Sequence, residues 1–313
     1  MHRMGCYGEL AAGPEVQDGS FRSGKCEAIR SVPRARSRAR ISLFVMSRVA
    51  LLGGGKMGAA LLGGLLDGGF DPDSLTVAEI DVERRKEIEA RFPKVRVVPS
   101  GAWGVADADV VIVAVKPGDV AASLAAALPA LPERALVLSI AAGVTIATLE
   151  AAAPGRPVVR AMPNTPALVG LGASAIAPGA VATDEHLDVA ARLLRSVGVV
   201  VRVDEPQLDA VTGLSGSGPA YVMLVAEALT EAGVLTGLPR VIAIQLVQQT
   251  LLGSATLLAN SDEGPESLRA AVTSPGGTTA AGLRALEARG VRAAFIDAVV
   301  AATERSRELG RKG

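Results

Sequence analysis

The sequence predicts an α/β fold in which an open, doubly wound sheet is followed by an all-helical domain. Three observations carry this prediction. Short apolar runs alternate with helical segments from residue 49 to about residue 203, a glycine-rich turn follows the first run, and only long helical patterns remain after residue 205. Alternating strands and helices are typical of a mostly parallel sheet with helices on both faces.

The predicted strands are apolar on both faces, as strands buried inside a parallel sheet are. They cover residues 49–53, 75–80, 95–98, 109–115, 135–140, 157–161, 173–177 and 199–203. Helical patterns between them cover residues 57–68, 82–91, 118–128 and 184–196. We therefore assign residues 46–204 to one sheet-containing domain.

Residues 205–313 form the predicted helical domain. Its helical patterns cover residues 218–234, 239–260, 279–289 and 291–309. The stretch 241–259 is apolar almost all round, which a helix tolerates only if neighbours or another subunit enclose it. By length it could also span a membrane, but Gln245, Gln248 and Asn260 would then need partners in lipid. We expect a buried helix of a soluble protein, a helical homodimer and no membrane partner.

Residues 1–45 differ from the rest of the chain. They carry Gly, Ser and Pro without periodicity, and then an arginine run from Arg34 to Arg40. We expect a disordered extension, or a start assigned upstream of the true one at Met46. An apolar signal core is missing, and the acidic residues argue against a mitochondrial leader. We therefore expect a cytoplasmic protein.

Charge, cysteine and histidine content exclude several classes of function. The 32 basic residues balance the 32 acidic ones, so no basic surface for nucleic acid is predicted. The cysteines are Cys6 and Cys26, and the histidines are His2 and His186. The chain after residue 45 therefore offers no disulfide, no cysteine nucleophile and no ordinary zinc site. We expect no metal.

The first strand runs into Gly53-Gly54-Gly55-Lys56-Met57-Gly58, which contains a G-x-G-x-x-G motif and opens a helix. Gly53 permits the tight turn, Gly55 lets a pyrophosphate approach the backbone, and Gly58 allows close helix packing. A second strand ends in the acidic residue Glu79 about 20 residues on, as in dinucleotide sites. The coincidence predicts a Rossmann-type dinucleotide-binding domain rather than a merely glycine-rich turn.

The sequence leaves open whether the cofactor is NADH or NADPH. Glu79 can accept hydrogen bonds from a ribose diol, which favours NADH, whereas Arg84 and Arg85 could meet a 2′-phosphate or only form a solvated helix face. Further cofactor contacts are expected where the fourth and fifth strands end, unless those segments are ordinary turns. These are Ala114, Val115, Lys116 and Pro117, and then Ile140, Ala141 and Ala142.

The chain offers few groups that could act as the base for alcohol oxidation. His186 lies in a charged helix start and is typical of a surface residue, and Tyr221 lacks a lysine four residues later. Lys116 is better placed to contact cofactor or to order its loop. A protonated imine needs no strong base, because hydride addition to it requires positioning and a hydrogen bond at nitrogen. The residues therefore favour imine reduction.

Two loops that open helices could bind an anion. In Thr273-Ser274-Pro275-Gly276-Gly277-Thr278-Thr279 the glycines expose backbone amides, and we expect Thr278 or Thr279 to cap the helix. A carboxylate could be held there by amides and hydroxyls. The second loop is residues 215–221. The alternative is that each is only a helix cap.

Taken together, these motifs resemble the pyrroline-5-carboxylate reductases. The similarity covers about residues 48–310 and rests on several motifs in order: residues 53–58, 114–117, 139–145, 160–166, 213–221 and 273–279. It implies NAD(P)H-dependent reduction of 1-pyrroline-5-carboxylate to L-proline, the last step of proline biosynthesis. It also implies a homodimer formed by the helical domain, often assembled into decamers.

The resemblance implies roles for the loop that contains Gly276. Ser274 and the amides of Gly277 and Thr278 are expected to hold the substrate carboxylate. Thr279 is expected to hydrogen-bond the ring nitrogen and is therefore the predicted catalytic residue.

The resemblance also adds Asn164 to the expected cofactor contacts. At Glu79 the chain departs from the family, because many relatives have a small polar residue there that tolerates NADPH.

Two rival functions remain at this point. A β-hydroxyacid dehydrogenase has a similar fingerprint and layout, but that family relies on a helix lysine, and residues 205–311 contain no lysine. A non-catalytic sensor would bind NAD(P)H without turning over an imine, and Thr279 would then be only a cap.

Overall fold

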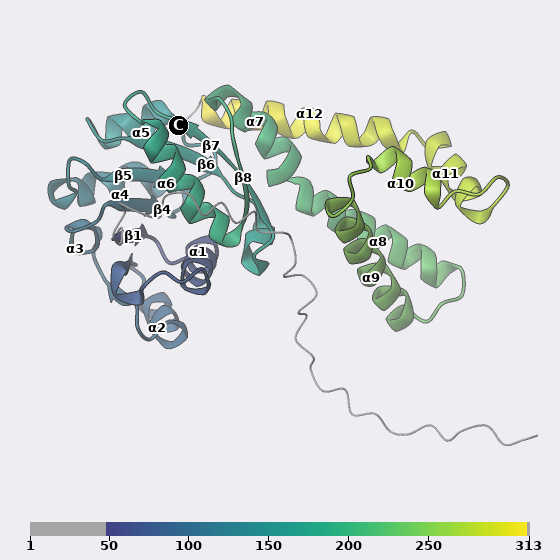
Figure 1. The fold of residues 1–313 in the computed structure, drawn as a ribbon, viewed down its shortest axis with the longest axis horizontal. Coiled ribbons are helices and arrows are strands. Elements are labelled where there is room, and N and C mark those ends of the chain that lie inside the picture. The colour runs from purple at the N-terminus through teal and green to yellow at the C-terminus, as the bar shows by residue number, and fades with distance from the viewer. Residues whose placement is uncertain (1–47, 312–313) are drawn as a thin grey trace, which may run out of the picture. The chain divides into compact units, whose positions relative to one another are not determined.

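A single eight-stranded sheet forms the first part of the protein. The computed structural model describes residues 48–311, so the predicted extension at residues 1–45 lies outside the described residues. The strand order is β3-β2-β1-β4-β5-β6-β7-β8, and every neighbouring pair is parallel except β6 and β7. The strands are β1 Val49–Leu52, β2 Leu75–Ala78, β3 Arg96–Val98, β4 Val110–Val113, β5 Leu136–Ser139, β6 Val158–Met162, β7 Gly172–Pro178 and β8 Gly198–Arg202. The predicted doubly wound sheet is confirmed (Figure 1).

Helices cover both faces of the sheet, which explains why its strands are apolar on both sides. Leu51 of β1 packs with Leu61 on one face, and Leu52 packs with Leu124 on the other. All four side chains are at most 3% exposed. The helices of this part are α1 Lys56–Asp67, α2 Val82–Arg91, α3 Gly101–Val105, α4 Val120–Ala127, α5 Ile146–Ala152 and α6 Asp184–Leu194.

From β8 to residue 311, where the described part of the chain ends, all regular elements are helices, as predicted. They are α7 Leu208–Val211, α8 Gly218–Leu235, α9 Arg240–Ala259, α10 Pro265–Ala271, α11 Thr278–Ala288 and α12 Val291–Gly310, with a π-helical turn Thr212–Gly216 between α7 and α8. The π-helical turn packs closely on α12, since a Cβ on Gly213 would lie 2.7 Å from the carbonyl oxygen of Val299. Nearby, the Ser306 hydroxyl donates to Asp209 at 2.7 Å.

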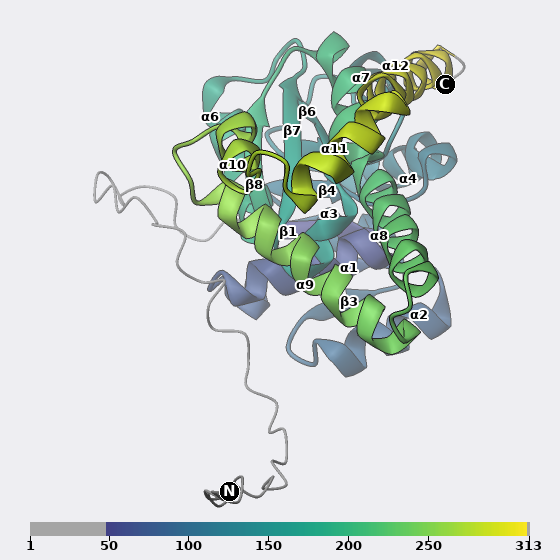
Figure 2. The ribbon, with the colours of Figure 1, turned by 90° about the vertical axis from the view of Figure 1, so that its right-hand side faces the viewer.

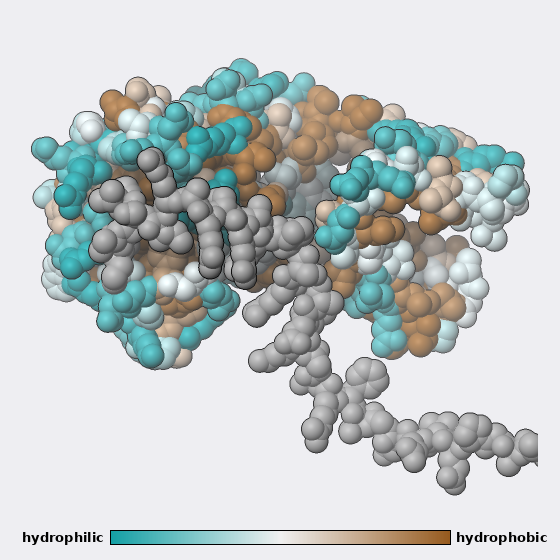
Figure 3. All heavy atoms as spheres, viewed as in Figure 1, coloured by the Kyte–Doolittle hydropathy of each residue, from teal (hydrophilic) through white to brown (hydrophobic). Residues whose placement is uncertain are grey.

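Helices α8 and α9 lie side by side, and both expose apolar residues (Figures 1 and 2). Neighbours in the same chain do not enclose α9, because Ala243 is its only buried residue. Of the two alternatives that the sequence left open, enclosure by another subunit stays a prediction. A helix packed mainly on one neighbour buries one stripe, whereas α9 is apolar all round. Hydrophobic side chains therefore reach the surface over α8 and α9 (Figure 3). By length and composition, the helical stretches Glu205–Leu235 and Arg240–Ala259 could each cross a membrane.

Candidate active site

The glycine-rich turn after β1 requires glycine at several positions. Gly53 has φ +97°, and a Cβ there would lie 2.9 Å from the carbonyl oxygen of Ala114. A Cβ on Gly58 would lie 2.5 Å from the carbonyl oxygen of Gly53, and one on Gly54 would overlap the Ile88 side chain. The turn is therefore held tightly between β1, β4 and α2. This is the packing that the sequence motif predicts.

The N-terminus of α1 is suited to an anion. Its N-cap is Gly55, no side chain caps the helix, and its first turn has no acidic residue. The amides of the first turn therefore have no acceptor within the helix, and the helix dipole places partial positive charge there. The exposed Lys56 adds a full positive charge at the same end. These groups fit the pyrophosphate of a dinucleotide.

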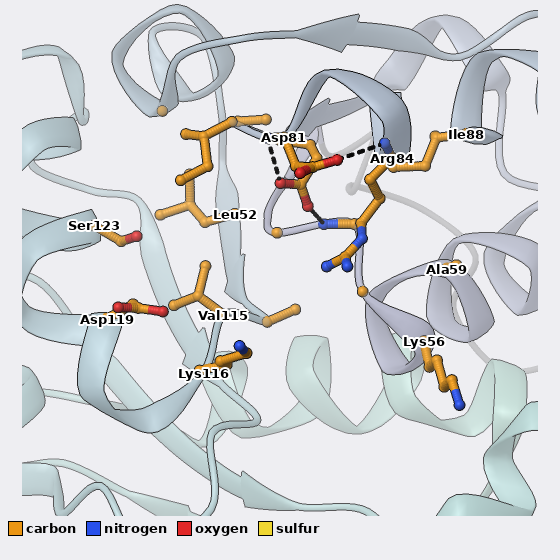
Figure 4. A pocket seen from close by; sticks show the side chains of 18 of the residues that line it. Leu52, Lys56, Ala59, Asp81, Arg84, Ile88, Val115, Lys116, Asp119 and Ser123 are labelled. Carbon is orange, nitrogen blue, oxygen red and sulfur yellow. Dashed lines mark hydrogen bonds between the residues drawn. The ribbon is translucent and has the colours of Figure 1, made fainter. Parts of the chain in front are cut away.

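A cavity of about 970 Å³ opens beside this turn, at the carboxyl ends of β1, β2 and β4 (Figure 4). That is the edge where ligands bind in open α/β sheets. The structure brings together eight of the predicted cofactor residues in its lining. They are Gly53, Gly54, Gly55, Lys56, Glu79, Ala114, Val115 and Lys116.

Helix faces supply much of the lining that the sequence motifs missed, and the segments at Ile80 and Asp119 supply more of it. From α2 come Glu87, Ile88 and Arg91, and from α4 come Ala122, Ser123 and Ala126. Only the helical spacing of α2 and α4 could have indicated them, because neither face contains a motif.

Glu79 lies at the carboxyl end of β2 and is only 6% exposed. Its Oε2 accepts a hydrogen bond from the Gly54 amide at 2.8 Å, and its Oε1 accepts one from the Asp81 amide at 2.9 Å. The carboxylate thus ties the end of β2 to the glycine-rich turn.

The two candidate arginines of α2 behave differently. Arg84 lines the cavity, and Figure 4 shows its side chain directed into it. Arg85 instead donates through one guanidinium nitrogen to the carbonyl oxygens of Glu79 and Ile80, both at 2.8 Å. Of the two, the structure thus places only Arg84 at the cavity.

Several predicted cofactor residues lie outside the cavity lining. Those of the turn and the strand ends are Met57, Gly58, Pro117, Ile140, Ala141 and Ala142. Asn164 donates to the carbonyl oxygen of Ser215 at 3.1 Å and accepts from the amide of Ala173 at 2.8 Å. Its side-chain amide therefore joins the end of β6 to the π-helical turn. A direct cofactor contact by Asn164 stays a prediction.

The predicted substrate loop precedes α11. Gly276 has φ +70°, and the Gly277 amide donates to the carbonyl oxygen of Ser274 at 3.1 Å. The expectation that Thr278 or Thr279 caps this helix is wrong, because the N-cap is Gly277 and no side chain caps it. Both threonines lie within the first turn, whose amides remain available to an anion.

The structure places the other titratable candidates in structural roles. The Nδ1 of His186 lies 3.0 Å from the Thr183 amide, in the capping box of α6. The Tyr221 hydroxyl donates to the carbonyl oxygen of Gly213 at 3.2 Å. Within residues 48–311, no group of three metal-ligating side chains occurs. The sequence expectation of chemistry without a histidine base fits this arrangement.

The fold and the cavity define a dinucleotide-dependent oxidoreductase with a helical second domain. Two family models match: pyrroline-5-carboxylate reductase dimerisation over residues 205–309, and NADP oxidoreductase, coenzyme F420-dependent, over residues 48–143. The chain belongs to the pyrroline-5-carboxylate reductase family, which confirms the resemblance seen in the sequence.

Curated relatives and solved structures agree on the family. The pyrroline-5-carboxylate reductase of Synechocystis is 44% identical over 85% of this chain and 99% of its own length. That of Mycobacterium tuberculosis is 45% identical over 85% of this chain and 98% of its own length. The Coxiella burnetii reductase structure matches with a TM-score of 0.81 at 34% identity, over 85% of this chain and 99% of that one. The Plasmodium falciparum reductase, solved with NADP bound, matches with a TM-score of 0.74 at 30% identity, over 84% of this chain and 98% of that one.

Proposed function

We propose that this protein reduces the imine of 1-pyrroline-5-carboxylate to L-proline with NADPH or NADH, as the last step of proline biosynthesis in the cytoplasm. The observation that carries the proposal is that one chain contains both a dinucleotide cavity and an uncapped loop before α11. The cavity is lined by the glycine-rich turn, and the loop exposes amides and hydroxyls suited to a carboxylate. The names of the relatives support the same reaction.

The chain itself contributes binding and positioning. When bound, the reduced nicotinamide supplies the hydride that adds to the imine carbon. The amides of the α1 N-terminus hold the pyrophosphate. The Ser274 hydroxyl and the Thr278 amide hold the substrate carboxylate, and the Gly277 amide joins them once its hydrogen bond to the Ser274 carbonyl oxygen opens. The Thr279 hydroxyl accepts a hydrogen bond from the protonated ring nitrogen. Because the substrate enters as a protonated imine, positioning and electrostatics account for most of the rate.

We propose the domain division that the sequence indicated. Residues 46–204 form the cofactor domain, and residues 205–313 form the substrate and dimerisation domain. The exposed apolar residues of α8 and α9 then cover one another in a homodimer, which explains why an all-apolar helix is left unburied in one chain. Dimers assemble further into a decamer, and the substrate lies at the dimer seam.

The test is oxidation of NADH and of NADPH by the purified full chain, each with and without 1-pyrroline-5-carboxylate. Imine-dependent oxidation is expected, with proline as the product. The control is the same protein with a 3-hydroxy acid and NAD⁺, which a β-hydroxyacid dehydrogenase would oxidise and this protein should not. Cofactor binding without any imine-dependent oxidation would favour the non-catalytic sensor instead.

A further inference from the structure

Glu79 is the only buried carboxylate within residues 48–311. Burying a charge is costly unless hydrogen bonds compensate it. The amides of Gly54 and Asp81 provide that compensation, one to each carboxylate oxygen. Such hydrogen bonds fix the position of the carboxylate. The end of β2 therefore carries a negative charge that cannot move away from the cavity.

The bonded carboxylate can still accept hydrogen bonds from a ligand. An ionised carboxylate has about four lone-pair sites, two on each oxygen, and each oxygen of Glu79 uses one for an amide. Glu79 also lines the cavity. A carboxylate at this place in a Rossmann domain accepts from the hydroxyls of the adenosine ribose.

The positive groups nearby do not neutralise this carboxylate. Arg85 is held by the carbonyl oxygens of Glu79 and Ile80. Arg91 stacks on the Phe92 ring, 5.0 Å from its centroid. Arg84 is directed into the cavity but is exposed and makes no ion pair with Glu79 (Figure 4).

We propose that Glu79 makes NADH the preferred cofactor of this protein. Its carboxylate accepts from the ribose hydroxyls of NADH. In NADPH a 2′-phosphate replaces one of these donors and places like charge against a fixed, buried anion. The proposal deepens the proposed function, because it names the cofactor that the same site selects.

The first experiment measures dissociation constants of NADH and NADPH for the full chain by nucleotide fluorescence, without imine. We expect NADH to bind at least about tenfold more tightly, the size of one hydrogen bond to a charged group. The same preference should appear in kcat/KM for imine reduction, and mainly in KM. In Glu79→Gln, which removes the charge at nearly constant shape, the preference should fall to less than about threefold, since the like-charge repulsion is gone.

The matched control is Glu89→Gln. Glu89 lies on the same helix α2, is exposed, does not line the cavity and bonds neither amide of the turn. This variant should keep the wild-type preference. If Glu79→Gln does not fold, competition of AMP and adenosine 2′,5′-bisphosphate against NADH on the wild type replaces it, and AMP should compete better.

NADPH binding as tightly as NADH to the wild type would overturn the proposal, and so would equal shifts of the preference in the Glu79 and Glu89 variants. The binding constants do not depend on imine turnover. A preference for NADH without imine reduction would therefore contradict the proposed function and leave the role of Glu79 intact.

Discussion

Replacing Gly58 by alanine should disrupt the cofactor site through one methyl group. The added Cβ would lie 2.5 Å from the carbonyl oxygen of Gly53, a distance below 3.0 Å that real Cβ atoms essentially never show. The neighbour is backbone, so no side-chain rotation relieves the contact. The glycine-rich turn and the start of α1 must separate, and these are the two elements that offer amides to the pyrophosphate.

The expected size of the effect follows from overpacking. Extra methyl groups in tightly packed sites cost about 1–3 kcal/mol. About 1.4 kcal/mol corresponds to a tenfold change in affinity. If the whole strain falls on the bound state, the NADH dissociation constant should therefore rise about 10- to 100-fold. Strain that falls on the unliganded fold instead lowers the thermal midpoint of unfolding, so the two measurements together account for the cost.

Gly63 provides a matched control in the same helix. A Cβ there would meet only the Phe92 ring at 3.8 Å, an ordinary contact. Gly63→Ala should therefore stabilise the protein by about 0.5–1 kcal/mol, because glycine inside a helix is entropically unfavourable, and leave NADH binding unchanged. Fluorescence titration and thermal unfolding of both variants test the pair. Unchanged NADH affinity in Gly58→Ala, or equal losses in both variants, would refute the reasoning.

Three further predictions concern the helical domain. Thr279→Ala should lower kcat about tenfold or more by removing one positioned hydrogen-bond acceptor for the ring N–H, with NADH affinity unchanged and activity restored in Thr279→Ser. Equal losses of kcat and affinity would contradict this role. Leu246 of α9 is 54% exposed in the single chain, and Leu246→Arg should reduce the mass measured by light scattering to that of a monomer. The control is Val181→Arg, at a residue that is 55% exposed, which should keep the wild-type mass. A Leu246→Arg variant of wild-type mass would argue against the proposed interface. The side-chain hydrogen bond and the charge of Arg240 lower the pKa of Glu231 below its ordinary value of 4.5. The ion pair therefore stabilises the folded state above pH 4.5. This stability is lost as the pH falls through the lowered pKa of Glu231. Urea midpoints of wild type and Glu231→Gln should therefore differ at neutral pH and converge in acid, and a difference independent of pH would exclude the pair as its cause.

The sequence predicts most of the fold because strands and long helices are recognised from apolar patterns within short segments of the chain. Every predicted strand is found within two residues of its expected ends. The missed helices α3, α5, α7 and α10 have at most seven residues, too few to show a helical period. The need for glycine at position 58 is predictable too, since the carbonyl oxygen that a Cβ there would meet belongs to Gly53 of the same turn. The contact of Gly53 itself is with Ala114, which is distant in the chain.

The parts of the site that the sequence could not give depend on contacts between distant residues. Nothing near Arg85 in the chain indicates that two carbonyl oxygens hold it away from the cavity. The cap of α11 was misplaced because threonine is a common N-cap, whereas the chain here uses Gly277 and leaves Thr278 in the helix. The composition of α9 predicts that something encloses it, but it does not distinguish neighbours in the same chain from another subunit; the structure excludes the first.

Isotope transfer tests the central claim most directly. The full chain is supplied with 1-pyrroline-5-carboxylate and NADH carrying deuterium at the transferred position of C4, and the product is analysed by mass spectrometry. The account predicts L-proline with one deuterium on the former imine carbon, because the hydride passes directly between two bound molecules. Proline without deuterium, or no proline while NADH still binds, would contradict it.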